Sequence, residues 1–246
     1  MVPQHAVAEL TNDISLERGV VLPLAISTAS AGLYQQGFLA LPLPSFEIPW
    51  KRLGRTVLIW GGSSSVGSCA IQLAVASGAE VITTASSRNF QYCKQLGANE
   101  VFDYHDPNVE ENIVKSLEGK TLAGVYHAVG ADGAVRACAR IADRAKGKAI
   151  VVTVRGVPDG GIPDSVRVKS ISSGTIFLEG NNVGPHIWRH YLPKALAQGS
   201  IVPKPDPMIV GSGLRSVQHG IDTQKAGVSA AKVVVDKINQ DASHEA

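Results

Sequence analysis

The stretch of sequence that decides the fold is Thr56-Val-Leu-Ile-Trp-Gly-Gly-Ser-Ser-Ser-Val-Gly67. Its first part, 56–60, is a short unbroken apolar run, which is typical of a strand covered on both faces. Apolar residues at helical spacing in 66–77 predict a helix directly after it. The glycine pair between them allows a sharp turn, and Gly67 allows the helix to pack closely on the strand. The sequence therefore predicts a strand, a glycine-rich turn and a helix.

A strand, turn and helix of this kind is the context in which a glycine-rich loop binds the pyrophosphate of a dinucleotide. The amides of residues 64–67 would point at the pyrophosphate, helped by the helix dipole. Ser64 replaces the middle glycine of the strict G-x-G-x-x-G pattern, but a serine can still pass close to a phosphate and donate a hydroxyl hydrogen bond. A tight turn without a ligand is the alternative. The residues expected to hold the pyrophosphate are Ser63, Ser64, Ser65, Val66 and Gly67.

Apolar runs alternate with helical patterns along the chain after this turn. Strands separated by helices of about 10–12 residues require parallel crossovers. The fold class is therefore α/β, a doubly wound, mostly parallel sheet of the Rossmann type with helices on both faces. The expected strands lie at 56–60, 80–84, 101–103, 122–127, 148–153 and 174–178, and the expected helices between them at 66–77, 88–96, 108–117 and 132–142.

The two ends of the chain have a different pattern. Residues 22–39 are rich in small side chains and predict a helix before the first strand. Beyond residue 185, we expect a helical pair at 186–198 and 213–225, followed by a return strand at 231–235. The C-terminal part therefore predicts an addition to the sheet rather than another strand-and-helix repeat.

The segment after the second strand distinguishes the two nicotinamide cofactors. Folds that select NAD place Asp or Glu at this strand end, about 20 residues past the loop, to hold the ribose 2′-hydroxyl. This chain continues Thr84-Ala-Ser-Ser-Arg-Asn89 without an acid. A carboxylate would repel a 2′-phosphate, whereas Ser86, Ser87, Arg88 and Asn89 offer donors to one. Helix capping is the alternative role for these residues, but it does not explain the missing acid. We therefore predict NADPH over NADH.

Charge and composition exclude several classes of protein. Lys and Arg (23) nearly balance Asp and Glu (21), and no basic block occurs, so neither a nucleic acid nor a membrane surface is indicated as a partner. No apolar stretch approaches the ~18 residues of a membrane span. Residues 1–15 lack the apolar centre of a signal peptide. Cys69, Cys93 and Cys138 form no metal-binding pattern, so we expect buried, reduced thiols, no metal site and a cytoplasmic protein.

Several segments together resemble the medium-chain dehydrogenase/reductase family, in particular its zinc-free quinone-reductase and enoyl-reductase branches. They are the stretch 56–67 with Ile71-Gln-Leu-Ala74, Gln95-Leu-Gly-Ala98 before Val101-Phe-Asp-Tyr104, and Gly227-Val-Ser-Ala-Ala-Lys-Val-Val-Val235. The serine-rich loop, with the later Ser-x-x-Asn-Phe, looks most like fungal trans-acting enoyl reductases that serve polyketide synthases. The resemblance covers roughly residues 5–238.

The resemblance implies further cofactor contacts and a domain organisation. Tyr104 matches an aromatic residue beside the adenine ribose. The other matching positions are Val151, Val152, Ile171, Thr175, Val233 and Val234. Family members begin with a catalytic β-rich domain, and the resemblance implies that this chain lacks it. The expected division is 1–50 for the end of that domain and a linker helix, 51–185 for the dinucleotide-binding core, 186–238 for the C-terminal helices and a strand that packs back, and 239–246 for a frayed tail.

The resemblance implies a zinc-free, NADPH-dependent oxidoreductase of secondary metabolism that reduces the activated C=C of an enoyl or enone substrate, a polyketide-derived small molecule. His127, at the end of the fourth strand, is the candidate proton donor, although an ordinary strand-to-loop turn explains it as well. Two alternatives stay open: a redox-independent isomerase or cyclase, and a non-catalytic module that binds NADPH or a partner. Apolar surface exposed by the lacking domain favours a homodimer or a partner chain.

Overall fold

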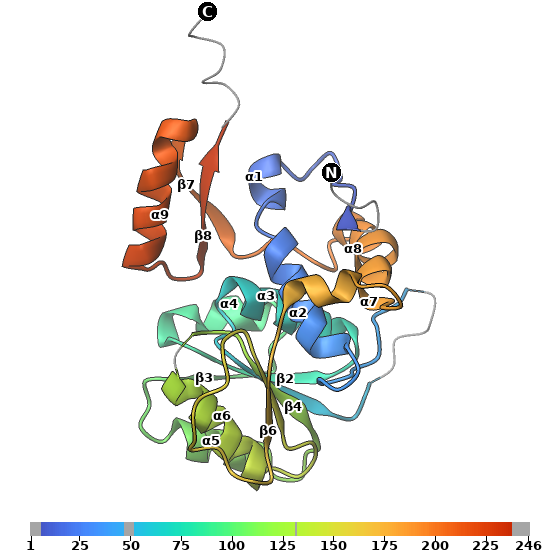
Figure 1. Cartoon of the computed structure of the whole chain (residues 1–246), viewed down its shortest axis with the longest axis vertical. Helices are drawn as coiled ribbons and strands as arrows, with labels where there is room; N and C mark the ends of the chain where they lie inside the picture. The colour runs from blue at the N-terminus through green and yellow to red at the C-terminus, as the bar shows by residue number, and fades with distance from the viewer. Residues whose placement is uncertain (1–5, 47–51, 131, 238–246) are drawn as a thin grey trace, which may run out of the picture.

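A parallel sheet forms the centre of the computed structural model, which describes residues 6–46, 52–130 and 132–237 (Figure 1). The strands, in chain order, are β1 (Thr56–Trp60), β2 (Glu80–Ala85), β3 (Glu100–Asp103), β4 (Leu122–His127), β5 (Ile150–Thr153) and β6 (Arg167–Ser170). All neighbouring pairs are parallel, and the order across the six-stranded sheet is β3-β2-β1-β4-β5-β6. Because the order reverses between β1 and β4, a crevice opens there at the carboxyl ends of the strands.

Helices cover both faces of this sheet, because successive side chains of β1 point to opposite faces and all of them are buried. Val57 and Ile59 face a core shared with α2 (Pro23–Tyr34) and α3 (Ser65–Ala76). Leu58 and Trp60 face a second core, built with α5 (Val109–Ser116) and α6 (Asp132–Arg144). α4 (Phe90–Gln95), preceded by the 3-10 turn η2 (Ser87–Asn89), covers the edge near β2 and β3. The predicted α/β fold class is confirmed.

The expected sixth strand was placed wrongly. Residues 174–178 do not enter the sheet; the 3-10 helix η3 (Ser173–Phe177) occupies this position. The strand is β6, which pairs with β5 from Ile150↔Arg167 to Thr153↔Ser170. The apolar side chains of η3 are buried against helical segments instead: Ile176 is fully buried and the Phe177 ring lies 6.4 Å from that of Trp188.

The C-terminal part contains the expected helices and one strand that the sequence analysis missed. The first helical segment consists of α7 (Val183–Pro185), the π-helical turn η4 (His186–Tyr191) and α8 (Leu192–Ala197). It is followed by β7 (Asp206–Ser212), the 3-10 turn η5 (Leu214–Ser216), α9 (Val217–Ala226) and β8 (Ala231–Asp236). The return strand β8 does not extend the large sheet, because it pairs in parallel with β7 in a separate two-stranded sheet.

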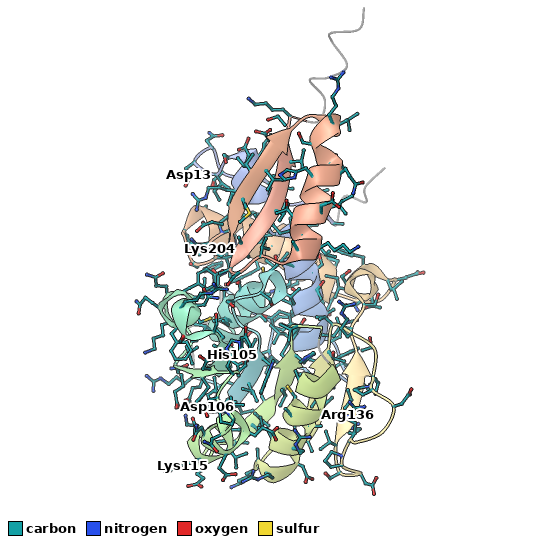
Figure 2. All side chains as sticks on the ribbon, turned by 90° about the vertical axis from the view of Figure 1, so that its left-hand side faces the viewer. Asp13, His105, Asp106, Lys115, Arg136 and Lys204 are labelled. Carbon is teal, nitrogen blue, oxygen red and sulfur yellow. The ribbon has the colours of Figure 1, made fainter. Side chains whose placement is uncertain are left out.

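We call β7, η5, α9 and β8, with the loops between them, the C-terminal unit. Figures 1 and 2 show it at one end of the molecule, and the labelled Lys204 in Figure 2 lies where the chain enters it. One face of its sheet is covered by α9, where Gly220 approaches Val210, Val233 and Val235. The loop between α9 and β8 returns toward the large sheet, which places residues 227–230 beside the crevice.

The N-terminal part contains α1 (Leu16–Gly19) and α2, so the helix expected at 22–39 is confirmed but ends at Tyr34. The resemblance also implies that residues 2–10 match the last strand of a preceding domain; no strand forms in 6–10, and residues 2–5 lie outside the described residues. The expected frayed tail, 239–246, also lies outside them. The division of the chain at 50, 185 and 238 stays a prediction.

Candidate cofactor site

A cleft of about 630 Å³ lies at the carboxyl ends of β1 and β2. One wall is the turn after β1 and the segment after β2, and the opposite wall consists of residues from α5 and α6. The loop that leads into β8 contributes a third wall. The predicted residues that the structure brings together around the cleft are Ser63, Ser64, Ser86, Arg88, Asn89 and Tyr104.

The turn after β1 has its shape because three positions exclude a side chain. Gly61 has φ +88°, and a Cβ there would lie 2.3 Å from Val129 Cγ1. A Cβ on Gly62 would lie 2.2 Å from Thr83 Oγ1, and one on Gly67 would lie 2.2 Å from the Gly61 carbonyl oxygen. The close approach of helix α3 to β1 predicted for Gly67 is therefore present.

The amides at the start of α3 divide into two groups. Ser64 is the N-cap: its amide donates to the Gly61 carbonyl (3.1 Å), and its Oγ accepts from the Gly67 amide (3.0 Å). The Ser64 hydroxyl also donates to the Ala128 carbonyl (3.1 Å). Of the amides in 64–67, those of Ser65 and Val66 are therefore the two that can donate to a phosphate, since first-turn amides have no intrahelical acceptor.

Ser65 lies at the same helix end, although neither Ser65 nor Val66 lines the cleft itself. The Ser65 Oγ is buried and has no hydrogen-bond partner among the described residues. A buried hydroxyl without a partner costs free energy unless a ligand or water satisfies it. The helix end, with Ser65, the two amides and the positive end of the α3 dipole, fits a pyrophosphate group.

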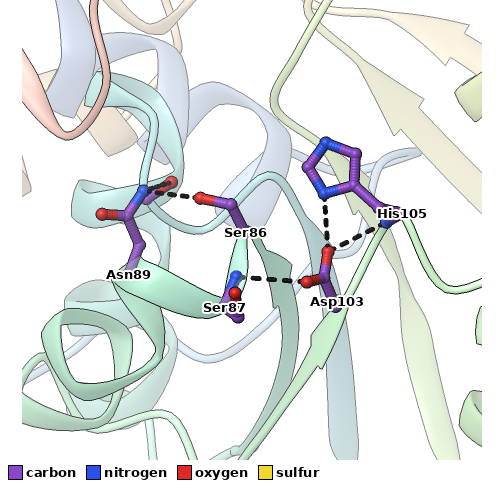
Figure 3. A network of polar contacts seen from close by, with 6 residues as sticks. Ser86, Ser87, Asn89, Asp103 and His105 are labelled. Carbon is purple, nitrogen blue, oxygen red and sulfur yellow. Dashed lines mark hydrogen bonds and ion pairs between the residues drawn. The ribbon is translucent and has the colours of Figure 1, made fainter.

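The segment after β2 presents Ser86 and Arg88 to the cleft. Ser87 does not line it: its amide donates to Asp103 Oδ2 (3.3 Å), as Figure 3 shows. The Asn89 side chain is 9% exposed, and its amide nitrogen contacts serine hydroxyls, including that of Ser86 at 3.1 Å. The direct contacts of Ser87 and Asn89 with a 2′-phosphate therefore stay predictions.

Asp103 is an acid that the sequence analysis missed near this segment. It belongs to β3 and lies close to the segment after β2 because the parallel register places it opposite Ala85. Its Oδ1 accepts the His105 amide hydrogen at 2.9 Å and contacts His105 Nδ1 at 2.8 Å (Figure 3). The hydrogen bond from the His105 amide lowers the pKa of Asp103. Both carboxylate oxygens of Asp103 accept hydrogen bonds from protein amides, and Asp103 does not line the cleft. The cleft therefore has no acid at the end of β2.

The wall opposite the turn is apolar except for one ion pair. Val109, Ala134 and Ala137 line it, and Tyr104, whose side chain is exposed, lies at its rim with its ring 4.1 Å from that of His105. These apolar residues and the tyrosine suit a flat adenine ring.

An Arg–Glu pair, also missed from the sequence, supplies the charge on this wall. Arg140 donates from Nε and Nη2 to the two oxygens of Glu110. This contact holds the pKa of Glu110 below its usual value. Because the pair is neutral as a whole, it adds little repulsion toward a phosphate.

The C-terminal residues at the cleft are Val228, Ser229 and Ala230, which the sequence analysis missed. The expected residues of this region, Val233 and Val234, lie in β8, opposite Met208 and Ile209 of β7. Val233 and Val234 do not line this cleft, and their contacts with a cofactor stay predictions.

Other predicted contacts lie away from this cleft and stay predictions. Val151 and Val152 are fully buried in β5, on opposite faces of the sheet. Ile171 packs near Gly32, and Thr175 Oγ1 accepts a hydrogen bond from Gln35 (2.8 Å). Burial in the sheet or against α2 accounts for these four positions without a cofactor.

His127, the candidate proton donor, is fully buried at the end of β4, and its Nδ1 lies 3.0 Å from Thr153 Oγ1. It does not line the cleft. A general acid must reach the reacting atom, directly or through one water. The burial of His127 therefore argues against that role.

The three cysteines are free and buried. Burial raises the pKa of Cys69 and of Cys93 to about 12, so neither thiol is a nucleophile. Across the described ranges 6–46, 52–130 and 132–237, no group of three or more His, Cys, Asp or Glu residues could hold a metal ion. Within the same part of the chain, no helix combines the length and the apolar character that crossing a bilayer requires.

Comparison with known proteins identifies the family. The family model for zinc-binding dehydrogenases matches residues 65–197. The trans-enoyl reductase himH of Aspergillus japonicus is 42% identical over 238 residues, which cover 96% of this chain and 66% of that protein. The dehydrogenase pigH of Monascus ruber is 41% identical over 251 residues, with 93% of this chain and 67% of that protein covered. The chain thus spans about two thirds of the length of these relatives.

Solved structures share the fold at low sequence identity. A quinone oxidoreductase from Pseudomonas syringae has a TM-score of 0.67 at 23% identity, over 95% of this chain and 69% of that one. A mycobacterial protein complexed with NADPH has a TM-score of 0.66 at 21% identity (93% and 68%). An NAD-dependent alcohol dehydrogenase has a TM-score of 0.68 at 20% identity (95% and 62%). The fold is therefore shared by proteins named for either cofactor. The chain belongs to the zinc-binding dehydrogenases of the medium-chain dehydrogenase/reductase family, a family of oxidoreductases.

Proposed function

We propose that this protein is a zinc-free, NADPH-dependent oxidoreductase of fungal secondary metabolism that reduces the activated C=C of an enoyl or enone substrate. When bound, the nicotinamide supplies the hydride that adds to the β-carbon of such a substrate, and a proton then adds to the α-carbon. The observation that carries the proposal is the cleft at the ends of β1 and β2, with phosphate donors on one side and an apolar wall on the other.

The chain's own residues would hold the cofactor at two phosphate positions. The Ser65 and Val66 amides at the start of the 12-residue helix α3 would hold the pyrophosphate. Arg88 and Ser86 line the cleft past the end of β2, where they would hold a 2′-phosphate. An NAD-selective site would need an acid free to accept from the ribose hydroxyls, and both oxygens of nearby Asp103 already accept from the protein.

The reaction type rests on the relatives. One of the matched proteins is named a trans-enoyl reductase, and its 42% identity extends over almost this whole chain. The zinc-free assignment and the polyketide-derived substrate rest on the sequence resemblance to the enoyl-reductase branch. Cytoplasmic action is part of the same proposal, in keeping with three free cysteines.

The direct test is NADPH oxidation by the purified protein, followed spectroscopically with a panel of enones and enoyl thioesters. We expect turnover with NADPH, a lower kcat/KM with NADH, and saturated product. Cofactor binding without turnover on any member of the panel would support the non-catalytic binding module instead. Product formed at full rate after removal of the nucleotide would support the isomerase or cyclase, and either result would overturn the reductase.

A further inference from the structure

Asn89 lies where three parts of the cleft meet. Its amide nitrogen is 3.4 Å from Ser63 Oγ in the turn after β1, 3.1 Å from Ser86 Oγ after β2, and 3.0 Å from Ser229 Oγ in the loop before β8. Figure 3 shows the Asn89 side chain turned toward Ser86. All three serines line the cleft, and so does Asn89, which is only 9% exposed. One buried amide therefore contacts three hydroxyls from three segments.

The direction of these hydrogen bonds determines what the hydroxyls can do. The Asn89 amide nitrogen carries two hydrogens: the shorter contacts make Ser229 (3.0 Å) and Ser86 (3.1 Å) the main acceptors, and Ser63 (3.4 Å) shares one of these hydrogens. A hydroxyl that accepts through a lone pair keeps its own hydrogen for another acceptor. A serine hydroxyl that accepts from Asn89 therefore keeps a hydrogen that it can donate into the cleft.

Ser229 connects this arrangement to the C-terminal unit. It lies in the loop between α9 and β8, where Gly227 (φ +94°) and Ala230 (φ +47°) both have left-handed backbone conformations. Such a conformation is unfavourable for Ala230, so contacts of the loop must maintain it. The Asn89–Ser229 hydrogen bond is one contact that fixes the loop against the dinucleotide-binding core.

We propose that Asn89 is a positioning residue: it orients the hydroxyls of Ser63, Ser86 and Ser229 as phosphate donors and thereby couples nucleotide binding to the placement of the C-terminal unit. This inference rests on the proposed function, because it takes the phosphates of NADPH as the acceptors. Coupling of this kind is reciprocal: a nucleotide that uses the Ser229 hydroxyl fixes the loop, and a fixed loop strengthens nucleotide binding.

The test uses Asn89→Leu, which keeps the size of the side chain, removes its donors and adds no charge. We expect NADPH binding, measured by calorimetry, to weaken by about tenfold or more, and Ser229→Ala to weaken it by a smaller factor. The two changes together should weaken binding by less than the product of the separate factors, because they remove one shared contact. Asn112→Leu is the matched control, since Asn112 is exposed in α5 and donates to Asp106 outside the cleft.

Hydrogen exchange of residues 227–236 provides the readout that general destabilisation would not reproduce. In the wild type, we expect NADPH to slow exchange in this segment, and Asn89→Leu to speed it in the free protein and to abolish the effect of NADPH there. Wild-type affinity in Asn89→Leu, or unchanged exchange in 227–236, would overturn the positioning role. If the wild type binds no NADPH, the proposed function fails and so does the phosphate part of this inference. The exchange of free Asn89→Leu then decides separately whether Asn89 fixes the loop.

Discussion

At the scale of single residues, some side chains at the cleft can contact a cofactor, whereas others form hydrogen bonds that hold the cleft together. Arg88 and Ser86 line it with their donors available, whereas Ser64 uses its hydroxyl within the protein, as acceptor from Gly67 and donor to Ala128. A serine in the middle of the phosphate loop therefore shapes the loop more than it binds the ligand.

Arg88→Ala should weaken NADPH binding by ~1–3 kcal/mol and leave NADH binding nearly unchanged, because only the 2′-phosphate accepts from this side chain. Calorimetric titration of the variant with both cofactors measures the difference. Arg189→Ala, at an exposed arginine that does not line the cleft, controls for the loss of a positive charge. Equal weakening of both cofactors would show that Arg88 does not select the 2′-phosphate.

Ser64→Ala should lower the free energy of unfolding by about 1–2 kcal/mol, since it removes the N-cap of α3 and the hydrogen bond to Ala128. Urea denaturation measures this change. Ser15→Ala removes the cap of the four-residue helix α1, a 3.4 Å exposed contact, and should cost clearly less. If the two variants lose the same free energy of unfolding, the Ser64 hydroxyl does not stabilise the loop after β1 in the way proposed.

The residues that sequence reasoning located best are those whose role is local. Gly67 and the serine loop follow from the order of strand, turn and helix, and the structure has them at the cleft or at its edge. Ser229 reaches the cleft through the return of the chain after α9, and Asp103 reaches Ser87 beside it through the register of β3 on β2, so both depend on tertiary structure. No local pattern carries that information.

At the scale of secondary-structure elements, the strands that were missed or displaced are short or at sheet edges. β6 has the sequence Arg-Val-Lys-Ser and is half exposed, so it lacks the apolar run of a central strand. β7 contains Pro207, which is compatible with a strand outside the large sheet because its nitrogen has no hydrogen to donate. The run at 174–178 was taken for a strand because burial against helices and burial within a sheet select the same apolar residues.

Two ion pairs join α5 to α6 beside the cleft, Glu110–Arg140 and Glu111–Arg144. The pKa of Glu110 is lowered by its hydrogen bond to Arg140, so its contribution to stability is present above the unfolded pKa of about 4.5 and is lost as the pH falls through the folded value. Because Glu110 and Arg140 are partly exposed, this contribution is about 0.5 kcal/mol.

Glu110→Gln should therefore be less stable than the wild type at neutral pH, and the difference should shrink toward zero as the pH falls below the unfolded pKa. Urea denaturation over a pH series measures this difference. Glu111→Gln, whose glutamate is 67% exposed, should show a smaller effect. A difference between Glu110→Gln and the wild type that grows on acidification would contradict the sign of the pKa shift.

At the scale of the whole molecule, two parts with separate sheets meet at the cofactor cleft. The part with the six-stranded sheet contributes Ser86 and Arg88, and the C-terminal unit contributes the loop with Ser229 (Figure 1). Three apolar residues of that unit, Leu214, Val217 and Ile221, lie at helical spacing and are 61%, 36% and 54% exposed. Such a stripe favours association with another protein surface.

We propose that the chain associates as a homodimer through this stripe. Light scattering at tens of micromolar should give a mass above that of one chain, and Ile221→Asp should reduce it. Gln224→Asp, at an exposed polar position of the same helix, controls for the added charge. A strictly monomeric wild type would contradict the homodimer. Cross-linking would then test whether the stripe binds a different chain.

The central claim is that the turn after β1 and the acid-free end of β2 form a site for the phosphates of NADPH. Calorimetric titration of the purified wild-type protein with NADPH and with NADH tests it most directly. We predict one site per chain, with NADPH bound about ten- to a hundredfold more tightly than NADH. Equal affinity for the two cofactors would contradict the selection of a 2′-phosphate, and binding of neither would contradict the account as a whole.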